Sequence, residues 1–148
     1  MMSLLLVFGL FSPTYDEMAT KNYWIKFNDF IHKFNSKVNL KPSTAPTEIK
    51  YTIAEIRKIP TKNVDMKLLM YCEKRINFAI EYSEFLESID IADNILSYKT
   101  EFPIRKKRES FMEMQKRYEL LYDKNLKLDK EQQELLAYLG EKYGLANK

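Results

Sequence analysis

The stretch from Val64 to Leu96 constrains the fold most strongly, because it contains neither glycine nor proline. An apolar stripe runs through it at steps of three and four residues, which is the spacing of one helix face. Its members are Leu69, Cys72, Ile76, Ala79, the single polar residue Ser83, Leu86 and Ile89. A second apolar stripe lies beside the first and consists of Phe78, Tyr82, Phe85 and Ile89. Two adjoining stripes predict a long helix that contacts partners on more than one side.

The distribution of glycine favours a helical fold for the whole chain. No glycine occurs between Gly9 and Gly140, whereas β-sandwiches and barrels need glycine in their turns. The chain has 148 residues, of which 45% are hydrophobic and 30% charged, a balance typical of one globular domain with its own core. The sequence therefore predicts an all-α protein, a bundle of four or five helices around a long antiparallel helical hairpin.

A first helix is expected to begin at Ser12-Pro13, since serine caps helices and proline suits the first helical position. Its core face carries Trp24, Phe27, Ile31, Phe34 and Val38. The polar stretch Asn39–Thr47 holds two prolines and is the expected linker.

A shorter helix with Ile49, Ile53 and Ile56 on one face is expected to end at Ile59-Pro60. Asp65 then has the residue type and position of an N-cap for the long helix.

The C-terminal part allows two interpretations. After a break near Phe102-Pro103, a helix is expected to bury Phe111, Met114, Tyr118 and Leu121. The same phase continues through Asn125, Leu128, Gln132, Leu135 and Leu139, which would make one very long helix with two polar positions in its seam.

The alternative is a break at Asp123–Leu128 and a restart at Asp129, which forms a capping-box pattern with Gln132. We favour this break. Gly140 and Gly144 are expected to end the last helix, and Glu141 to Lys148 to fray.

Residues 1–12 are expected to be a signal or anchor segment that precedes a single helical domain, residues 13–148. The apolar run Leu4–Phe11 has the length of a signal-peptide hydrophobic region and is too short for a standard membrane span. It has no basic residue before it and no small-x-small cleavage pattern after it. The paired Met1 and Met2 leave a start further upstream open. The alternative is a leading segment that packs onto the helices.

One segment carries a resemblance. The run IPTKNVD at residues 59–65, followed by Leu68, Leu69 and Tyr71, resembles a segment of small, uncharacterised exported helical proteins of bacteria. The resemblance covers about a fifth of the chain and includes no catalytic motif. It implies a helical fold and an export route, and no activity.

The sequence predicts no catalytic, cofactor or metal site. His32 is the single histidine, and Asp29 on the same helix face gives only two of the ligands that a metal site requires. Cys72 lies on an apolar stripe, which indicates a buried thiol rather than a reactive one.

The candidate interaction patch is the basic cluster Arg105, Lys106, Lys107 and Arg108. Such a cluster can contact phosphate, but the net charge of +3 and the absence of a nucleic-acid-binding signature do not favour that partner. The long helix carries an acidic ribbon, Glu81, Glu84, Glu87, Asp90 and Asp93. We expect this ribbon to oppose the basic cluster across the hairpin.

These features favour a non-enzymatic, exported or cell-envelope helical protein that acts through contacts with a protein partner, with a membrane contacted only through the N-terminal segment if that segment is retained. The alternative is a cytosolic helical adaptor or nucleic-acid-associated protein that uses Arg105–Arg108. The sequence leaves the partner and the oligomeric state open.

Overall fold

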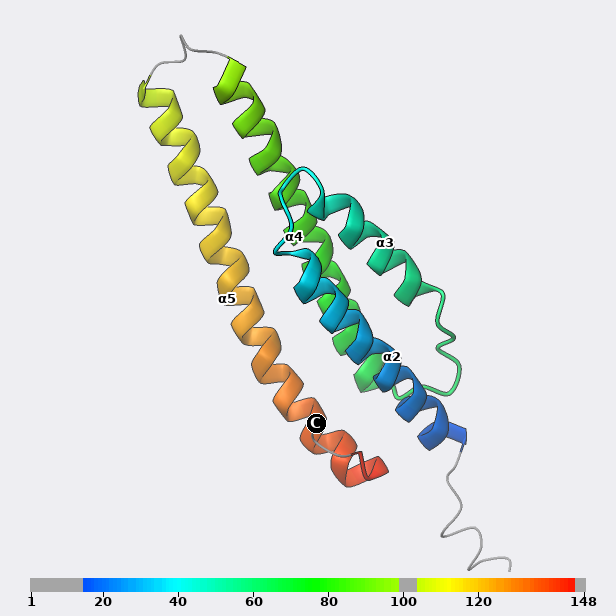
Figure 1. Ribbon diagram of the computed structural model, residues 1–148. Helices are drawn as coiled ribbons and strands as arrows, with labels where there is room; N and C mark the ends of the chain where they lie inside the picture. Colours follow the sequence, from blue (N-terminus) through cyan, green and yellow to red (C-terminus); the bar gives the residue numbers. More distant parts are fainter. Residues whose placement is uncertain (1–14, 99–103, 146–148) are drawn as a thin grey trace, which may run out of the picture.

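The computed structural model describes residues 15–98 and 104–145 (Figure 1). In these ranges it contains four α-helices and no strand: α2 (Tyr15–Lys37), α3 (Ala45–Arg57), α4 (Met66–Tyr98) and α5 (Ile104–Tyr143). The predicted all-α class is confirmed.

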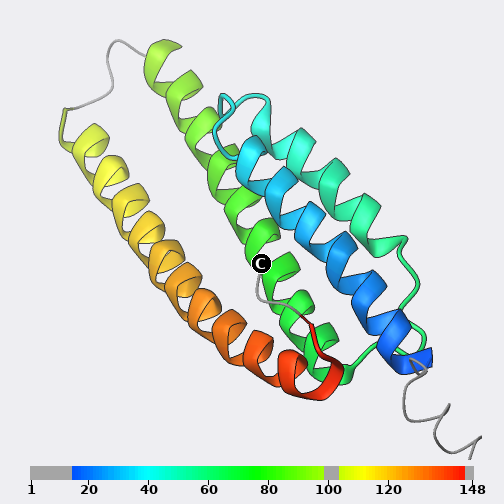
Figure 2. The ribbon, with the colours of Figure 1, turned by 60° about the horizontal axis from the view of Figure 1, so that its bottom comes forward.

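Helix α4 is the central element. Helix α5 lies along one side of it, whereas α2 and α3 pack on the other side (Figures 1 and 2). The two helices run antiparallel, because residues further along α4 contact residues earlier in α5. The pairs that show this register are Arg75 with Asp129, Glu81 with Lys124, and Phe85 with Tyr118.

The aromatic face of α2 forms much of the core. Trp24 is 5% exposed and Phe27 is fully buried, with its ring edge-on to Tyr71 of α4 at 6.1 Å. Cys72 is 1% exposed, and burial raises the pKa of its thiol, which is the environment of an unreactive cysteine.

The linker between α2 and α3 is shorter than the predicted Asn39–Thr47. Helix α3 begins at Ala45, and Pro46 is buried in its first turn. Proline is tolerated there because the first backbone N–H groups of a helix have no intrahelical acceptor. The predicted apolar face of Ile49, Ile53 and Ile56 is buried.

Asp65 caps α4 as expected. One of its carboxylate oxygens accepts a hydrogen bond from the backbone N–H of Lys67 at 2.8 Å. The turn before it contains Asn63 with a φ of 63°, a conformation that asparagine tolerates better than most side chains.

Helix α5 is continuous, so the predicted break at Asp123–Leu128 with a restart at Asp129 is wrong. Apolar seam residues within that segment and on both sides of it are buried: Leu121, Leu128, Leu135 and Leu139. The two polar seam positions, Asn125 and Gln132, hydrogen-bond to Arg75 of α4, which removes the physical reason for a break.

The end of α5 also differs from the prediction. Gly140 lies within the helix, which ends at Tyr143 and is followed by Gly144 with a φ of 65°. Tyr143 is 9% exposed, so fraying from Glu141 onwards is wrong for residues 141–143. Contacts of Lys142 and Tyr143 with Asp65 hold this last turn in place.

Three predictions fall on other parts of the chain. The helix start at Ser12-Pro13, the apolar run Leu4–Phe11 and the break near Phe102-Pro103 lie outside the described residues.

The burial of Trp24 gives a direct test of the α2 packing face. Trp24→Ala should lower the free energy of unfolding by about 3–5 kcal/mol, because it leaves a large cavity in the core. Ile25→Ala is the matched control, since Ile25 is 63% exposed and should change stability by no more than about 0.5 kcal/mol. Urea denaturation of the two variants measures both effects, and equal stabilities would contradict this packing.

Candidate functional site

The guanidinium of Arg75 makes four hydrogen bonds at the interface between α4 and α5. Its Nε donates to the Tyr71 hydroxyl at 2.6 Å, and its Nη1 donates to Asn125 Oδ1 at 2.8 Å. Its Nη2 donates to Asp129 Oδ1 at 2.6 Å and to Gln132 Oε1 at 3.3 Å. The Tyr71 hydroxyl in turn donates to Gln132 Oε1 at 2.8 Å. We refer to these five residues as the Arg75 cluster.

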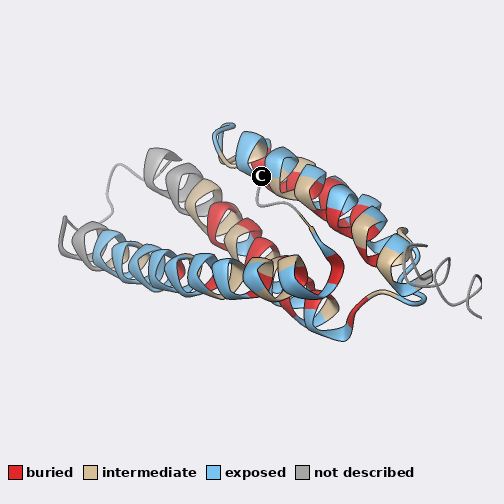
Figure 3. Cartoon of the chain, turned by 90° about the horizontal axis from the view of Figure 1, so that it is seen from below, coloured by how far each residue is buried: buried red, intermediate tan, exposed pale blue. Residues whose placement is uncertain are grey.

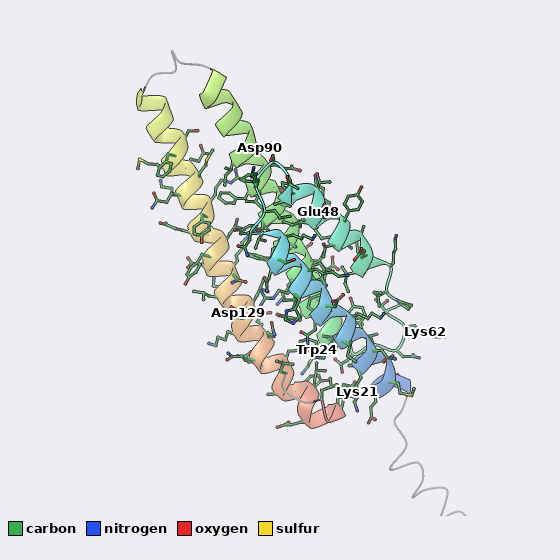
Figure 4. All side chains as sticks on the ribbon, in the orientation of Figure 1. Lys21, Trp24, Glu48, Lys62, Asp90 and Asp129 are labelled. Atoms are coloured by element: carbon green, nitrogen blue, oxygen red, sulfur yellow. The ribbon has the colours of Figure 1, made fainter. Side chains whose placement is uncertain are left out.

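The cluster is buried on its cationic side and open on its anionic side. The side chain of Arg75 is 10% exposed, whereas that of Asp129 is 55% exposed. Figure 4 shows Asp129 on the side of α5 that faces α2 and α4. The buried guanidinium therefore has its hydrogen bonds satisfied by protein groups, while water solvates much of the charge of its carboxylate partner.

A cavity of about 330 Å³ adjoins the cluster between α2, α4 and α5. Its apolar wall consists of Phe30, Ile31, Phe34 and Phe78. Its polar wall consists of Asn35, Arg75, Asn125, Asp129 and Gln132. We refer to this space as the Arg75 cavity. A volume of this size is at the lower end of the range of about 300–1,000 Å³ that small-molecule sites occupy.

A second cavity of about 180 Å³ adjoins the first and shares four of its wall residues. It is also lined by Val38, Tyr82, Tyr118, Leu121 and Tyr122. We refer to it as the tyrosine cavity. Rings follow one another along this side of the hairpin at centroid distances of 6.0–6.2 Å, from Phe34 to Tyr82, Tyr82 to Phe85 and Phe85 to Tyr118.

Helix α5 exposes large apolar side chains beside the tyrosine cavity. Phe111, Tyr118, Tyr122 and Leu126 are 70%, 48%, 54% and 49% exposed, and their spacing of seven, four and four residues places them on one helix face. We refer to them as the α5 stripe. Figure 3 shows that exposed residues cover most of α5, whereas buried residues are concentrated where α4 meets its neighbours.

The exposure of Phe111 and Tyr118 contradicts their predicted place in the core. The pair α4–α5 extends beyond the end of α2 (Figure 1), and there α5 has only α4 beside it among the described helices. A helix with one neighbour buries a narrow seam, so Leu121 is covered while Phe111 on the adjoining face is not.

A second polar cluster fastens the opposite end of the bundle. One oxygen of Asp65 accepts hydrogen bonds from the hydroxyls of Tyr143 at 2.7 Å and Tyr138 at 2.9 Å and from Lys142 Nζ at 3.3 Å. The backbone N–H of Asp65 donates to Thr20 Oγ1 of α2 at 3.0 Å. Residues of α2, α4 and α5 therefore meet at Asp65.

These contacts determine the titration of Asp65. Burial alone would raise the pKa of its carboxyl group, but hydrogen bonds from Tyr143, Tyr138, the Lys67 backbone and Lys142 outweigh burial and lower the pKa to about 2.

The candidate patch Arg105–Arg108 lies in the first turns of α5, and its side chains are outside the described residues. The same holds for Asp93 of the acidic ribbon. Of the ribbon carboxylates, Glu81 pairs with Lys124 of α5 at 2.6 Å, whereas Glu87 pairs with Lys50 of α3 at 2.5 Å. The opposition between the ribbon and Arg105–Arg108 stays a prediction.

Two further sequence features can be placed. His32 is exposed on α2, and the described residues contain no group of three or more histidine, cysteine or carboxylate side chains arranged to hold a metal ion. Among the described helices, none combines the length and apolar character needed to span a bilayer.

Arg75 was not among the predicted site residues. The sequence does contain a signal for this role. Tyr71, Arg75 and Phe78 are spaced by four and three residues, so Arg75 lies in line with the second apolar stripe. A charged residue in that phase faces the polar seam positions Asn125 and Gln132 on the partner helix.

No family model, curated protein or solved structure matches the chain. The resemblance of residues 59–71 to small exported helical proteins therefore stays a prediction.

The lowered pKa of Asp65 predicts acid sensitivity. Because the folded-state pKa lies below the ordinary value of 3.8, the stabilisation is fully present above about pH 4 and is lost as the pH falls towards 2. The loss should be about 2 kcal/mol for this side chain. Denaturation of the parent and of Asp65→Asn between pH 7 and pH 2 measures it. The difference in stability between the two proteins should shrink with falling pH, and a constant difference would contradict the assignment.

Proposed function

We propose that this is a non-enzymatic helical protein that acts through protein–protein contacts, built around the α4–α5 pair as its central hairpin. The α5 stripe is the contact surface. The observation that supports the proposal is the exposure of Phe111, Tyr118, Tyr122 and Leu126, which share one face of α5 and stay 48–70% exposed. Contiguous exposed apolar side chains are typical of interaction surfaces, and tyrosine is frequent at their energetic centres.

The partner that fits this surface is an amphipathic helix of another protein. The stripe runs straight along α5 for about 22 Å, at roughly 1.5 Å rise per residue. Its steps of four and seven residues match those that a docked helix uses for its own apolar contacts. Exposed charged residues lie between the stripe positions and include Glu119 and Asp123, which would form the polar rim of such a contact.

We further propose an exported or cell-envelope location, which is supported by the apolar run Leu4–Phe11 and is independent of the α5 stripe. The basic cluster Arg105–Arg108 supports the alternative of a cytosolic adaptor or nucleic-acid-associated protein.

Site-specific photocrosslinking tests the contact surface. A photoreactive residue at Tyr122 should form an adduct with a defined partner protein in the cells that produce this chain. The same residue at Lys127, which is exposed and lies on another face of α5, should not. Tyr118→Glu introduced beside the Tyr122 crosslinker should abolish the adduct, because it places a charge in the apolar contact.

Thermal denaturation of each variant shows that the fold is retained. An adduct of equal yield at Tyr122 and Lys127, or none at Tyr122, would contradict the proposed surface.

A further inference from the structure

We propose that the Arg75 cavity is a binding site for a medium-chain fatty acid, with the carboxylate at the polar wall and the hydrocarbon chain extending into the tyrosine cavity. This proposal does not require the α5 stripe to be a contact surface, although Tyr118 and Tyr122 belong both to the stripe and to the lining of the tyrosine cavity. It follows from the hydrogen-bonding groups left at the polar wall, the apolar opposite wall and the shape of the two adjoining spaces.

The polar wall presents hydrogen-bond donors that are accessible from the cavity, since Asn125 and Gln132 are only partly buried. The guanidinium of Arg75 can only donate, so it requires the carboxamide oxygens of Asn125 and Gln132, which lie 2.8 Å and 3.3 Å from its nitrogens. That requirement fixes both amides and turns their NH₂ groups away from the guanidinium. Within the described ranges, neither amide nitrogen donates to a protein acceptor.

The opposite wall and the shape of the space select an extended apolar body. Phe30, Phe34 and Phe78 supply apolar lining of the Arg75 cavity, and Phe34 and Phe78 also border the tyrosine cavity. From Arg75 to Tyr82 the two spaces follow α4 for about 10 Å, at roughly 1.5 Å rise per residue. A carboxylate with a linear alkyl chain satisfies both ends, because it offers acceptor oxygens at one end and apolar surface along its length.

The charge of Asp129 limits the affinity for such a ligand. Its carboxylate is 2.6 Å from Arg75 Nη2 and would repel a second carboxylate nearby. With its side chain 55% exposed, water screens much of this repulsion. Asp129→Asn should therefore strengthen the binding of a carboxylate, by about tenfold or less, and leave the binding of an uncharged analogue unchanged.

Gln132→Glu is the decisive variant. A glutamate at this position retains an acceptor for Arg75 and for the Tyr71 hydroxyl but loses the NH₂ donor and adds a negative charge to the wall. Gln133→Glu is the matched control, because it adds the same charge at the next residue, which is exposed and does not line the cavity.

Isothermal titration calorimetry with decanoate and decanol, both as monomers in solution, tests the proposal on the full chain. Decanoate should bind with one-to-one stoichiometry and at least tenfold more tightly than decanol. Gln132→Glu should weaken the binding of decanoate at least tenfold relative to both the parent and Gln133→Glu. Circular dichroism shows whether each variant retains the helical fold.

Three results would overturn the proposal: no binding of decanoate to the parent protein, equal binding of decanol and decanoate, or unchanged decanoate binding in folded Gln132→Glu. If Gln132→Glu does not fold, Asn125→Asp makes the same exchange of donor for charge on the other side of the guanidinium, and the same results apply to it.

Discussion

The contact between Arg75 and its four acceptors is the constraint on which the arrangement of α4 and α5 depends. Arg75 supplies a charge in the apolar phase of α4, and a charge that is 10% exposed must be compensated by neighbouring groups. The compensation comes from Asn125, Asp129 and Gln132 of α5 together with Tyr71 of α4. These distances are met in one register of the two helices, because a shift of α5 by a single turn would bring leucine to the guanidinium.

The two ends of the bundle differ in how they are closed. At one end, the Asp65 carboxylate accepts hydrogen bonds from Tyr138, Lys142 and Tyr143 of α5, and its backbone N–H donates to Thr20 of α2. The Arg75 cavity and the tyrosine cavity follow from the Arg75 cluster, where residues of α2, α4 and α5 line them. Towards the other end, beyond the end of α2, the described part of α5 has only α4 as its neighbour (Figure 1). This combination would suit the proposed contact with a partner, because the less covered end could adapt while the other end keeps the fold intact.

The sequence was sufficient for much of the helical framework. Steps of three and four residues indicated α4 and the apolar face of α3, and the same reasoning placed Trp24 and Cys72 in the core. Asp65 was identified as a cap because capping depends on residue type and local position alone. Each of these features depends on residues close together in the sequence, so it can be predicted without knowing which helices pack together.

The errors concern features that depend on the neighbouring helix. The pattern of Asp129 and Gln132 resembles a capping box, but both side chains bond to Arg75 within an unbroken helix. Gly140 does not end α5, because the contacts of Tyr143 with Asp65 stabilise one more turn. Phe111 was expected in the core from its phase, but periodicity along one helix does not show how many neighbours that helix has.

The most direct measurement of the central claim is the stability of two variants in urea denaturation. Arg75→Met should lower the free energy of unfolding by about 1–3 kcal/mol, since it leaves the polar groups of Tyr71, Asn125 and Gln132 without their donor. Adding Tyr71→Phe, Asn125→Leu and Gln132→Leu makes this part of the interface apolar and should restore the stability or exceed that of the parent. A parent-like stability of Arg75→Met, or no recovery in the combined variant, would contradict the claim that the Arg75 cluster holds α4 and α5 together.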